Sequence, residues 1–336
     1  MVQRKDQSGE APSVLVVRNT GLGDLMTGLP ALRAVRRALP AHRLGTTCPS
    51  WLVPLARALD AADFYVCEDV NGDFDIARHQ DVDADVLREV MRSAPDVVVA
   101  LRVPKAGRTE ALADLAAGTM VGFRHDWVEA TAGHPPFDDG EHVLARWSRL
   151  LRAFGIPSRV ADLHPDVRLD TDRPDRTVVH VGAGSPARQW PVVRWAEVAR
   201  TLAEDGHDVV FTGSPSEAEL VERTRRLAGL GPTTDLSGGC TALELAGLIQ
   251  RARLVLSTDT GVSHLATAFR RPSVTVFGPT SPVLWGPPDS PLHPTLWAGL
   301  SGDPYAPEPF PGLLDIAVAD VLSAASSALS AQEAIG

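Results

Sequence analysis

The feature that most constrains this chain is an alternation of short apolar runs with stretches of helical periodicity, and it occurs twice. Runs typical of buried parallel strands lie at 14–17 (VLVV), 96–101 (DVVVAL), 177–181 (TVVHV), 207–212 (HDVVFT), 254–257 (LVLS) and 273–277 (SVTVF). Segments between those runs, such as 24–39 and 193–205, carry apolar residues at helical spacing. Strands that alternate with helices predict parallel sheets covered by helices, and therefore an α/β fold.

A stretch rich in Pro and Asp, residues 157–175, interrupts the alternation, and the pattern restarts directly after it. The length of 336 residues also suits two domains better than one core. We predict two Rossmann-like, doubly wound domains, an N-terminal one over 13–156 and a C-terminal one over 176–312, which face each other across a cleft. Residues 313–330 predict a closing helix, which we expect to pack back on the N-terminal domain.

The composition excludes several classes of protein. The net charge of −10 argues against nucleic acid as a partner, because phosphate binding needs an excess of Lys and Arg. Cys48, Cys67 and Cys240 are few, odd in number and widely spaced, so they predict neither a disulfide framework nor a zinc site. The polar N-terminus lacks the apolar core of a signal peptide, and no apolar run is as long as a spanning helix. We therefore expect a cytoplasmic protein with at most peripheral membrane contact.

The glycine loop after the first strand, Gly21-Leu22-Gly23-Asp24, permits more than one interpretation. A dinucleotide-binding turn needs a third glycine or alanine three positions after Gly23 and an acidic residue about 20 positions later. Met26 holds the third position, and the next strand ends without an acid, which disfavours an NAD-dependent oxidoreductase. Asp24 then either caps the following helix or presents its carboxylate at the strand edge where ligands bind in open α/β sheets.

Three polar loops of the second half each follow a predicted strand, so their side chains should meet at one edge of the second sheet. They span Ser185–Pro191, Ser257–His264 and Phe277–Pro282. In the first loop, Ser185 and Arg188 can grip a diphosphate, since a guanidinium offers phosphate oxygens a fixed fork of donors. The plainer alternative is a solvated loop with a packing tryptophan.

The second of these loops places Asp259 before a helix whose first N–H groups form an anion site. Asp259 itself repels phosphate, so we interpret it as an acceptor of hydrogen bonds from sugar hydroxyls. His264 lies just inside the helix, where a histidine is more often a core residue than a functional one. The third loop, with Gly278 and Pro279, is either a rigid turn or a wall of the cleft. Together the loops outline one pocket for a nucleotide diphosphate, which Asp24 would face from the other domain.

These stretches, taken together and in this order, resemble glycosyltransferase family 9, the heptosyltransferase family. The strongest parts of the resemblance are NTGLGDLMTGLPALRAVRRALP, HVGAGSPARQWP and LSTDTGVSHLATAFRRPSVTVFGPTSP, and it extends over residues 13–290. The resemblance implies the GT-B fold of two Rossmann-like domains. It also implies an inverting, metal-independent transfer of a sugar from a nucleotide diphosphate sugar, ADP-heptose in most of the family, with no further cofactor.

The resemblance also implies roles for single residues. Asp24 takes the place of the family's catalytic base, and Arg188 takes that of a phosphate-binding lysine, so that a planar fork replaces a point donor. The implied donor-binding loop comprises Asp259, Thr260, Gly261, Ser263 and His264, to which the loop argument adds Ser185, Gly278 and Pro279. Basic residues that hold acceptor phosphate in the lipopolysaccharide enzymes have looser counterparts here in Arg102, Lys105 and Arg108.

The expected mechanism passes through a transition state that resembles an oxocarbenium ion, as in glycoside hydrolysis. Asp24 would take the proton of the acceptor hydroxyl, while Arg188, Ser185 and the helix start after Gly261 stabilise the leaving diphosphate. Closure about residues 157–175 would exclude water. The acceptor is expected to be a saccharide or small molecule, either an envelope glycan or a natural-product scaffold. Two alternatives share the diphosphate pocket: a GT-B sugar-nucleotide epimerase and a binder without catalysis.

Overall fold

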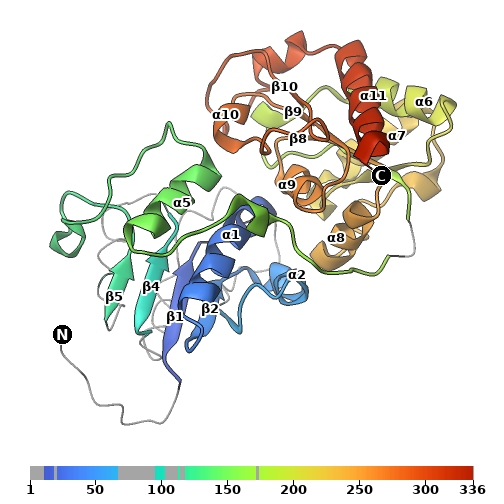
Figure 1. Cartoon of the computed structure of the whole chain (residues 1–336). Coiled ribbons are helices and arrows are strands. Elements are labelled where there is room, and N and C mark those ends of the chain that lie inside the picture. Colours follow the sequence, from blue (N-terminus) through green and yellow to red (C-terminus); the bar gives the residue numbers. More distant parts are fainter. Residues whose placement is uncertain are drawn as a thin grey trace.

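The computed structural model describes residues 11–18, 21–66, 95–102, 113, 118–171 and 174–335. Within them the chain forms two five-stranded sheets whose strands all pair in parallel, one in each half of the molecule (Figure 1). The predicted α/β fold with two parallel-sheet domains is confirmed. Cys67, Lys105 and Arg108 lie outside the described residues, so their predicted roles have no structural counterpart here.

The first sheet has the strand order β3-β2-β1-β4-β5. Its strands are β1 (Ser13–Val17), β2 (Arg43–Thr47), β3 (Phe64–Val66), β4 (Val97–Ala100) and β5 (Thr119–Val121). Val14 and Val16 belong to the core cluster that includes the first helix, whereas Leu15 and Val17 belong to a cluster on the opposite face. The central strand is therefore buried on both faces, which explains its uniformly apolar sequence.

The helices of this half are α1 (Leu22–Ala38), α2 (Val53–Ala58) and α5 (Val143–Ala153), with the short 3-10 helices η1 (Ser50–Leu52), η3 (Glu129–Thr131) and η4 (Val160–Leu163). Helix α1 begins directly after the glycine loop, and α5 packs against it. Polar residues that end β1 therefore lie beside the first turn of α1.

The second sheet has the strand order β10-β9-β8-β6-β7. Its strands are β6 (Thr177–His180), β7 (Val209–Thr212), β8 (Leu254–Thr258), β9 (Ser273–Val276) and β10 (Thr295–Leu296). Its helices are α6 (Val192–Glu204), α7 (Ala218–Ala228), α8 (Ala242–Gln250), α9 (Gly261–Ala268), α10 (Pro282–Trp285) and α11 (Val318–Ile335), with the 3-10 helices η5 (Pro186–Arg188), η6 (Pro215–Glu217), η7 (Pro232–Thr234) and η8 (Pro311–Asp315). The loops after β6, β8 and β9 leave the sheet at the same edge, because the strands are parallel.

The two halves are packed together through helices. Helix α1 lies against α9, and α2 lies against α8. One apolar cluster crosses this junction, with Met26 and Leu29 of α1 on one side and Ile249 and Leu265 of α8 and α9 on the other. The start of α1 is thereby fixed next to the start of α9.

The segment predicted as a linker, residues 157–175, is tied to both halves. Arg37 forms a two-pronged ion pair with the Asp162 carboxylate, at 2.9 and 2.6 Å, and Arg33 donates to the Asp162 carbonyl at 2.6 Å. On the other side, the Gln250 side chain accepts from the Leu169 amide at 2.8 Å and donates to the Val167 carbonyl at 2.7 Å. The described part of this connection therefore forms a strap across the junction of the two domains.

The closing helix does not pack where we predicted. Helix α11 lies against β9 and α6 of the second half (Figure 1), and its residues Val321 and Ala325 join the core cluster of that sheet. The expectation that residues 313–330 pack on the N-terminal domain is wrong. Its apolar positions predict a buried face but do not indicate which of two sheets receives it. None of the described helices is long and apolar enough to cross a membrane.

Candidate active site

Asp24 lies in the first turn of α1, close to the carboxyl end of β1. The N-cap of this helix is Gly21, whose backbone is extended (φ −150°, ψ 172°) and which contributes no side-chain cap. The alternative in which Asp24 caps the helix is therefore wrong, because Asp24 is already the third helical residue. Its side chain remains 31% exposed, which leaves the carboxylate accessible to a substrate.

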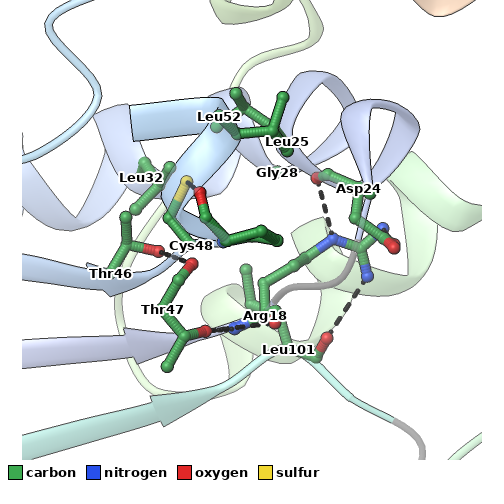
Figure 2. A pocket seen from close by; sticks show the side chains of 12 residues that line it. Arg18, Asp24, Leu25, Gly28, Leu32, Thr46, Thr47, Cys48, Leu52 and Leu101 are labelled. Atoms are coloured by element: carbon green, nitrogen blue, oxygen red, sulfur yellow. Dashed lines mark hydrogen bonds and ion pairs between the residues drawn. The ribbon is translucent and has the colours of Figure 1, made fainter. Parts of the chain in front are cut away.

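Arg18, the residue directly after β1, forms an ion pair with this carboxylate and is not among the residues predicted from the sequence. Its Nη2 lies 3.0 Å from Asp24 Oδ1, and its Nε donates to the Asp24 carbonyl at 3.2 Å (Figure 2). The only signal in the sequence is a charged residue at the end of the uniformly apolar run VLVVR. Burial lowers the pKa of the Arg18 guanidinium, the Asp24 carboxylate opposes this change, and nearby Arg146 adds to it.

A small cavity beside Asp24 separates the start of α1 from the loop that follows β2 (Figure 2). It is lined by Arg18, Gly21, Asp24, Leu25, Gly28, Leu32, Thr46, Thr47, Cys48, Pro49, Leu52 and Leu101. Its volume of about 20 Å³ is close to that of a single water molecule, so it cannot hold a sugar ring.

The three polar loops of the second half meet at one edge of the sheet, as predicted. Arg188 in η5 donates from Nη1 to the Asp259 carbonyl at 3.1 Å, which joins the first loop to the second. The Asp259 carboxylate accepts a hydrogen bond from the Thr280 hydroxyl at 2.5 Å, which joins the second loop to the third. Asp259 is only 7% exposed, so its carboxylate is fixed in the wall of the site.

Three buried polar atoms in these loops have no hydrogen-bond partner within the described part of the chain. They are Ser257 Oγ, Thr260 Oγ1 and Arg188 Nε. Buried polar atoms in folded proteins are nearly always hydrogen-bonded, so a cluster of exceptions needs an explanation. Ser257 lies near the end of β8, and Arg188 and Thr260 lie after the ends of β6 and β8, which is where a polar ligand would satisfy all three atoms.

The other predicted donor residues lie in the same cluster of loops, but their polar groups already have partners. The Ser185 hydroxyl donates to the Pro304 carbonyl, and the Ser263 hydroxyl donates to the Thr260 carbonyl at 2.7 Å. The carbonyl of Gly278 accepts from the Trp297 indole at 3.1 Å, and that of Pro279 accepts from the Gly302 amide at 3.0 Å. These residues stabilise the conformation of the loops. The hydroxyl protons of Ser185 and Ser263 already form hydrogen bonds within the protein.

Two glycines allow the first turns of α1 and α9 to touch. A Cβ atom on Gly261 would lie 2.6 Å from Leu22 Cβ and 2.9 Å from the Gly23 amide nitrogen. A Cβ atom on Gly23 would lie 2.9 Å from His264 Cδ2. All three distances are shorter than non-bonded heavy atoms in contact adopt, so glycine at both positions permits this approach. The glycine loop of the first domain and the Asp-Thr-Gly loop of the second therefore form one contact.

His264 lies at this contact, between the two domains. Burial lowers the pKa of its imidazole, while the Asp259 and Asp24 carboxylates oppose this change and Arg18 and His142 reinforce it. A lowered pKa keeps the ring neutral near pH 7. His264 therefore fills the junction as an uncharged ring between two carboxylates.

A second carboxylate that the sequence did not indicate is that of Glu217. It lies against Gly182 at the end of β6, where a Cβ atom would collide with it. Glu217 also opposes the lowering of the His180 pKa that burial causes. Glu217 also forms a helix-capping box with Ser214. Of the predicted acceptor residues, Arg102 alone is described; it directly follows Leu101, whose carbonyl accepts a hydrogen bond from Arg18.

The described residues contain no group of three or more His, Cys, Asp or Glu side chains that would hold a metal ion.

Two Rossmann-like domains, with a carboxylate on one and a cluster of polar loops at the strand ends of the other, are the arrangement of the GT-B glycosyltransferases. Comparison with known proteins agrees. Residues 139–298 match glycosyltransferase family 9 (heptosyltransferase). The chain is similar to this family over those residues, which indicates a glycosyltransferase.

Individual relatives are distant in sequence but similar in length and fold. Lipopolysaccharide heptosyltransferase 1 of Escherichia coli K12 is 25% identical over 302 residues, which cover 81% of this chain and 90% of the relative. Its counterpart from Pseudomonas aeruginosa is 27% identical over 303 residues, with 81% and 80% covered. Among solved structures, E. coli ADP-heptose lps heptosyltransferase II has a TM-score of 0.74 at 20% identity, with 96% and 99% of the two chains covered. E. coli heptosyltransferase WaaC with ADP-2-deoxy-2-fluoro heptose has a TM-score of 0.65 at 20% identity, with 93% and 98% covered.

Proposed function

We propose that this glycosyltransferase moves heptose from ADP-heptose to a hydroxyl of an envelope saccharide, in one inverting step with Asp24 as general base. The observation that carries the proposal is the contact between the first turns of α1 and α9, which brings Asp24 next to the loop that contains Asp259. One solved relative is named for ADP-heptose, and another is described with ADP-2-deoxy-2-fluoro heptose, which supports the choice of donor. The curated relatives are named for lipopolysaccharide, which supports the acceptor class.

In this proposal the donor diphosphate lies at the strand ends of the second sheet. Arg188 supplies positive charge, and the first N–H groups of α9, after Thr260, point to the same place. The unsatisfied atoms of Ser257, Thr260 and Arg188 are the groups that the donor would engage. The Asp259 carboxylate, held by Thr280, would accept hydrogen bonds from hydroxyls of the transferred sugar.

The proposed reaction is a single displacement. The acceptor oxygen forms a bond to the anomeric carbon while the bond from that carbon to the diphosphate oxygen breaks. The proton of the acceptor hydroxyl goes to the Asp24 carboxylate, and the electron pair of the broken bond leaves with ADP. Arg188 and the start of α9 would stabilise the charge that develops on ADP, so the step needs no metal ion. One displacement inverts the anomeric centre.

Asp24→Asn tests the proposal, because it keeps the shape of the side chain and removes its basicity. We expect kcat for ADP release from ADP-heptose, with a heptose-free lipopolysaccharide as acceptor, to fall by about 100- to 10,000-fold. The affinity for ADP, measured by calorimetry, is expected to stay unchanged. Asp126→Asn is the matched control, since Asp126 also pairs with an arginine of the first domain, at 3.5 Å, but is 79% exposed and outside the site.

Turnover of Asp24→Asn near the wild-type rate would show that Asp24 is not the base. The epimerase alternative is tested separately, by incubating the wild-type enzyme with ADP-heptose alone. A changed sugar in the recovered nucleotide would favour the epimerase, whereas unchanged ADP-heptose supports transfer to an acceptor.

A further inference from the structure

We infer that Arg18 is a positioning residue, which fixes the Asp24 carboxylate in the orientation that the transfer needs. The inference rests on the proposed function, because it assigns Arg18 a role that acts through the proposed base. Arg18 is 8% exposed and ends β1, so it projects from the centre of the first sheet. It contacts Asp24 at two points, through the ion pair to the carboxylate and through the hydrogen bond to the main-chain carbonyl.

Most N–H groups of the Arg18 guanidinium donate to atoms of the protein itself. Besides the two contacts with Asp24, Nη2 donates to the Thr27 hydroxyl at 2.8 Å. Nη1 donates to the Leu101 carbonyl at 3.3 Å (Figure 2). These contacts engage four of the five N–H groups of an arginine. A guanidinium in this state cannot also clamp a phosphate by its fork. Its role is therefore to hold protein atoms in place and not to bind the donor.

The rest of Arg18 is held as firmly as its charged end. Its main-chain amide donates to the Thr47 hydroxyl at 3.1 Å, and that hydroxyl donates back to the Arg18 carbonyl at 3.1 Å. The Trp147 ring lies 4.7 Å from the guanidinium carbon, and the aliphatic part of the side chain packs beside Gly28, where an added Cβ would make an ordinary contact of 3.4 Å with Cδ. Through these contacts Arg18 connects β1, β2, α1 and α5 to the Asp24 carboxylate.

This arrangement fits a base that must stay in one orientation. A planar fork that contacts both the carboxylate and the main chain of Asp24 restricts the rotation of its side chain, which a single ammonium group cannot do. His264, from α9, also lies near Asp24, and burial lowers the pKa of its imidazole, so its ring adds no positive charge beside Arg18 near pH 7. Because the Asp24 carboxylate is already oriented before the substrates bind, their binding energy is not needed to order it.

The test compares Arg18→Met and Arg18→Lys with the wild type, by the same ADP-release assay. Arg18→Met is expected to lower kcat by about 100-fold, the effect of a misplacement of about 1 Å, with unchanged affinity for ADP. Arg18→Lys is expected to have an intermediate kcat, because it restores the charge without the fork. Arg225→Lys is the matched control. Arg225 is 9% exposed and pairs with Glu222 at 2.8 Å on α7, remote from Asp24.

A double-mutant cycle separates positioning from a direct role. If Arg18 acts through Asp24, then Arg18→Met in the Asp24→Asn background causes no further loss of kcat. An additional 100-fold loss in that background, or a weakened affinity for ADP, would overturn the inference. Should Arg18→Met fail to fold, as judged by its thermal midpoint, the same cycle with Arg18→Lys decides the question.

The cycle also distinguishes this inference from the proposed function. Loss of activity in Asp24→Asn together with full kcat in Arg18→Met would refute the positioning role and leave the proposed base intact. Full activity in Asp24→Asn would refute the proposed base and the positioning role with it.

Discussion

Replacing Gly261 with alanine tests whether the contact between α1 and α9 sets the geometry of the reaction. The new Cβ would lie 2.6 Å from Leu22 Cβ and 2.9 Å from the Gly23 nitrogen. Carbon atoms in contact are normally about 3.5–4.0 Å apart, so the shortfall is about 1 Å. The Gly23 nitrogen belongs to the main chain and cannot rotate away, so α1 as a whole must shift relative to α9.

A shift of about 1 Å between a base and a bound donor is expected to lower kcat by about 100-fold. The same overpacking is expected to lower the free energy of unfolding by about 1–3 kcal/mol. ADP release measures the first effect, and denaturant unfolding measures the second. Gly231→Ala is the matched control, because Gly231 has φ −69° and no atom within 4 Å of an added Cβ. Wild-type kcat and wild-type stability in Gly261→Ala would refute the argument.

Two further predictions concern the donor site and the dependence of stability on pH. Arg188→Ala is expected to weaken ADP binding by about 10- to 100-fold, which is the contribution of one hydrogen bond to a charged group. Calorimetry in the presence of EDTA measures this affinity, and Arg200→Ala is the control because Arg200 is exposed. Unchanged affinity for ADP in Arg188→Ala would exclude Arg188 from the phosphate site. His293 is 7% exposed, and burial, with a smaller effect of His164, lowers its pKa from 6.5 to about 4. The unfolded chain therefore binds a proton on His293 that the folded protein does not, and the free energy of unfolding should fall by up to about 3 kcal/mol as the pH decreases from 6.5 to 4. His293→Gln is expected to flatten this part of the stability profile, and an unchanged slope would contradict the assignment.

The sequence predicted the sheets and the meeting of the polar loops because both depend on local pattern. A run such as DVVVAL is typical of a strand buried on both faces, and β4 is such a strand. Parallel strands then bring the loops that contain Arg188 and Asp259 to one edge, as the hydrogen bond between them confirms. The roles of these residues in binding the donor stay predictions.

Three features could not be predicted, because they depend on distances between remote parts of the chain. Arg18 is one charged residue after an apolar run, and its partners Leu101 and Trp147 are separated from it by most of the first domain. The closing helix α11 has an apolar face that suits either sheet. The need for glycine at position 261 comes from Leu22, which belongs to the other domain.

The apolar cluster that runs from α1 and α2 into α8 and α9 has a consequence for how the chain folds. If the two halves were separated, for example after cleavage of the chain within residues 157–175, side chains such as Leu29 and Leu265 would become exposed to water. Each half thus shields part of the other's core, and loss of either leaves the remaining half with an aggregation-prone surface. The protein has two sheets, but because they share this apolar cluster we expect the whole chain to unfold as one cooperative unit.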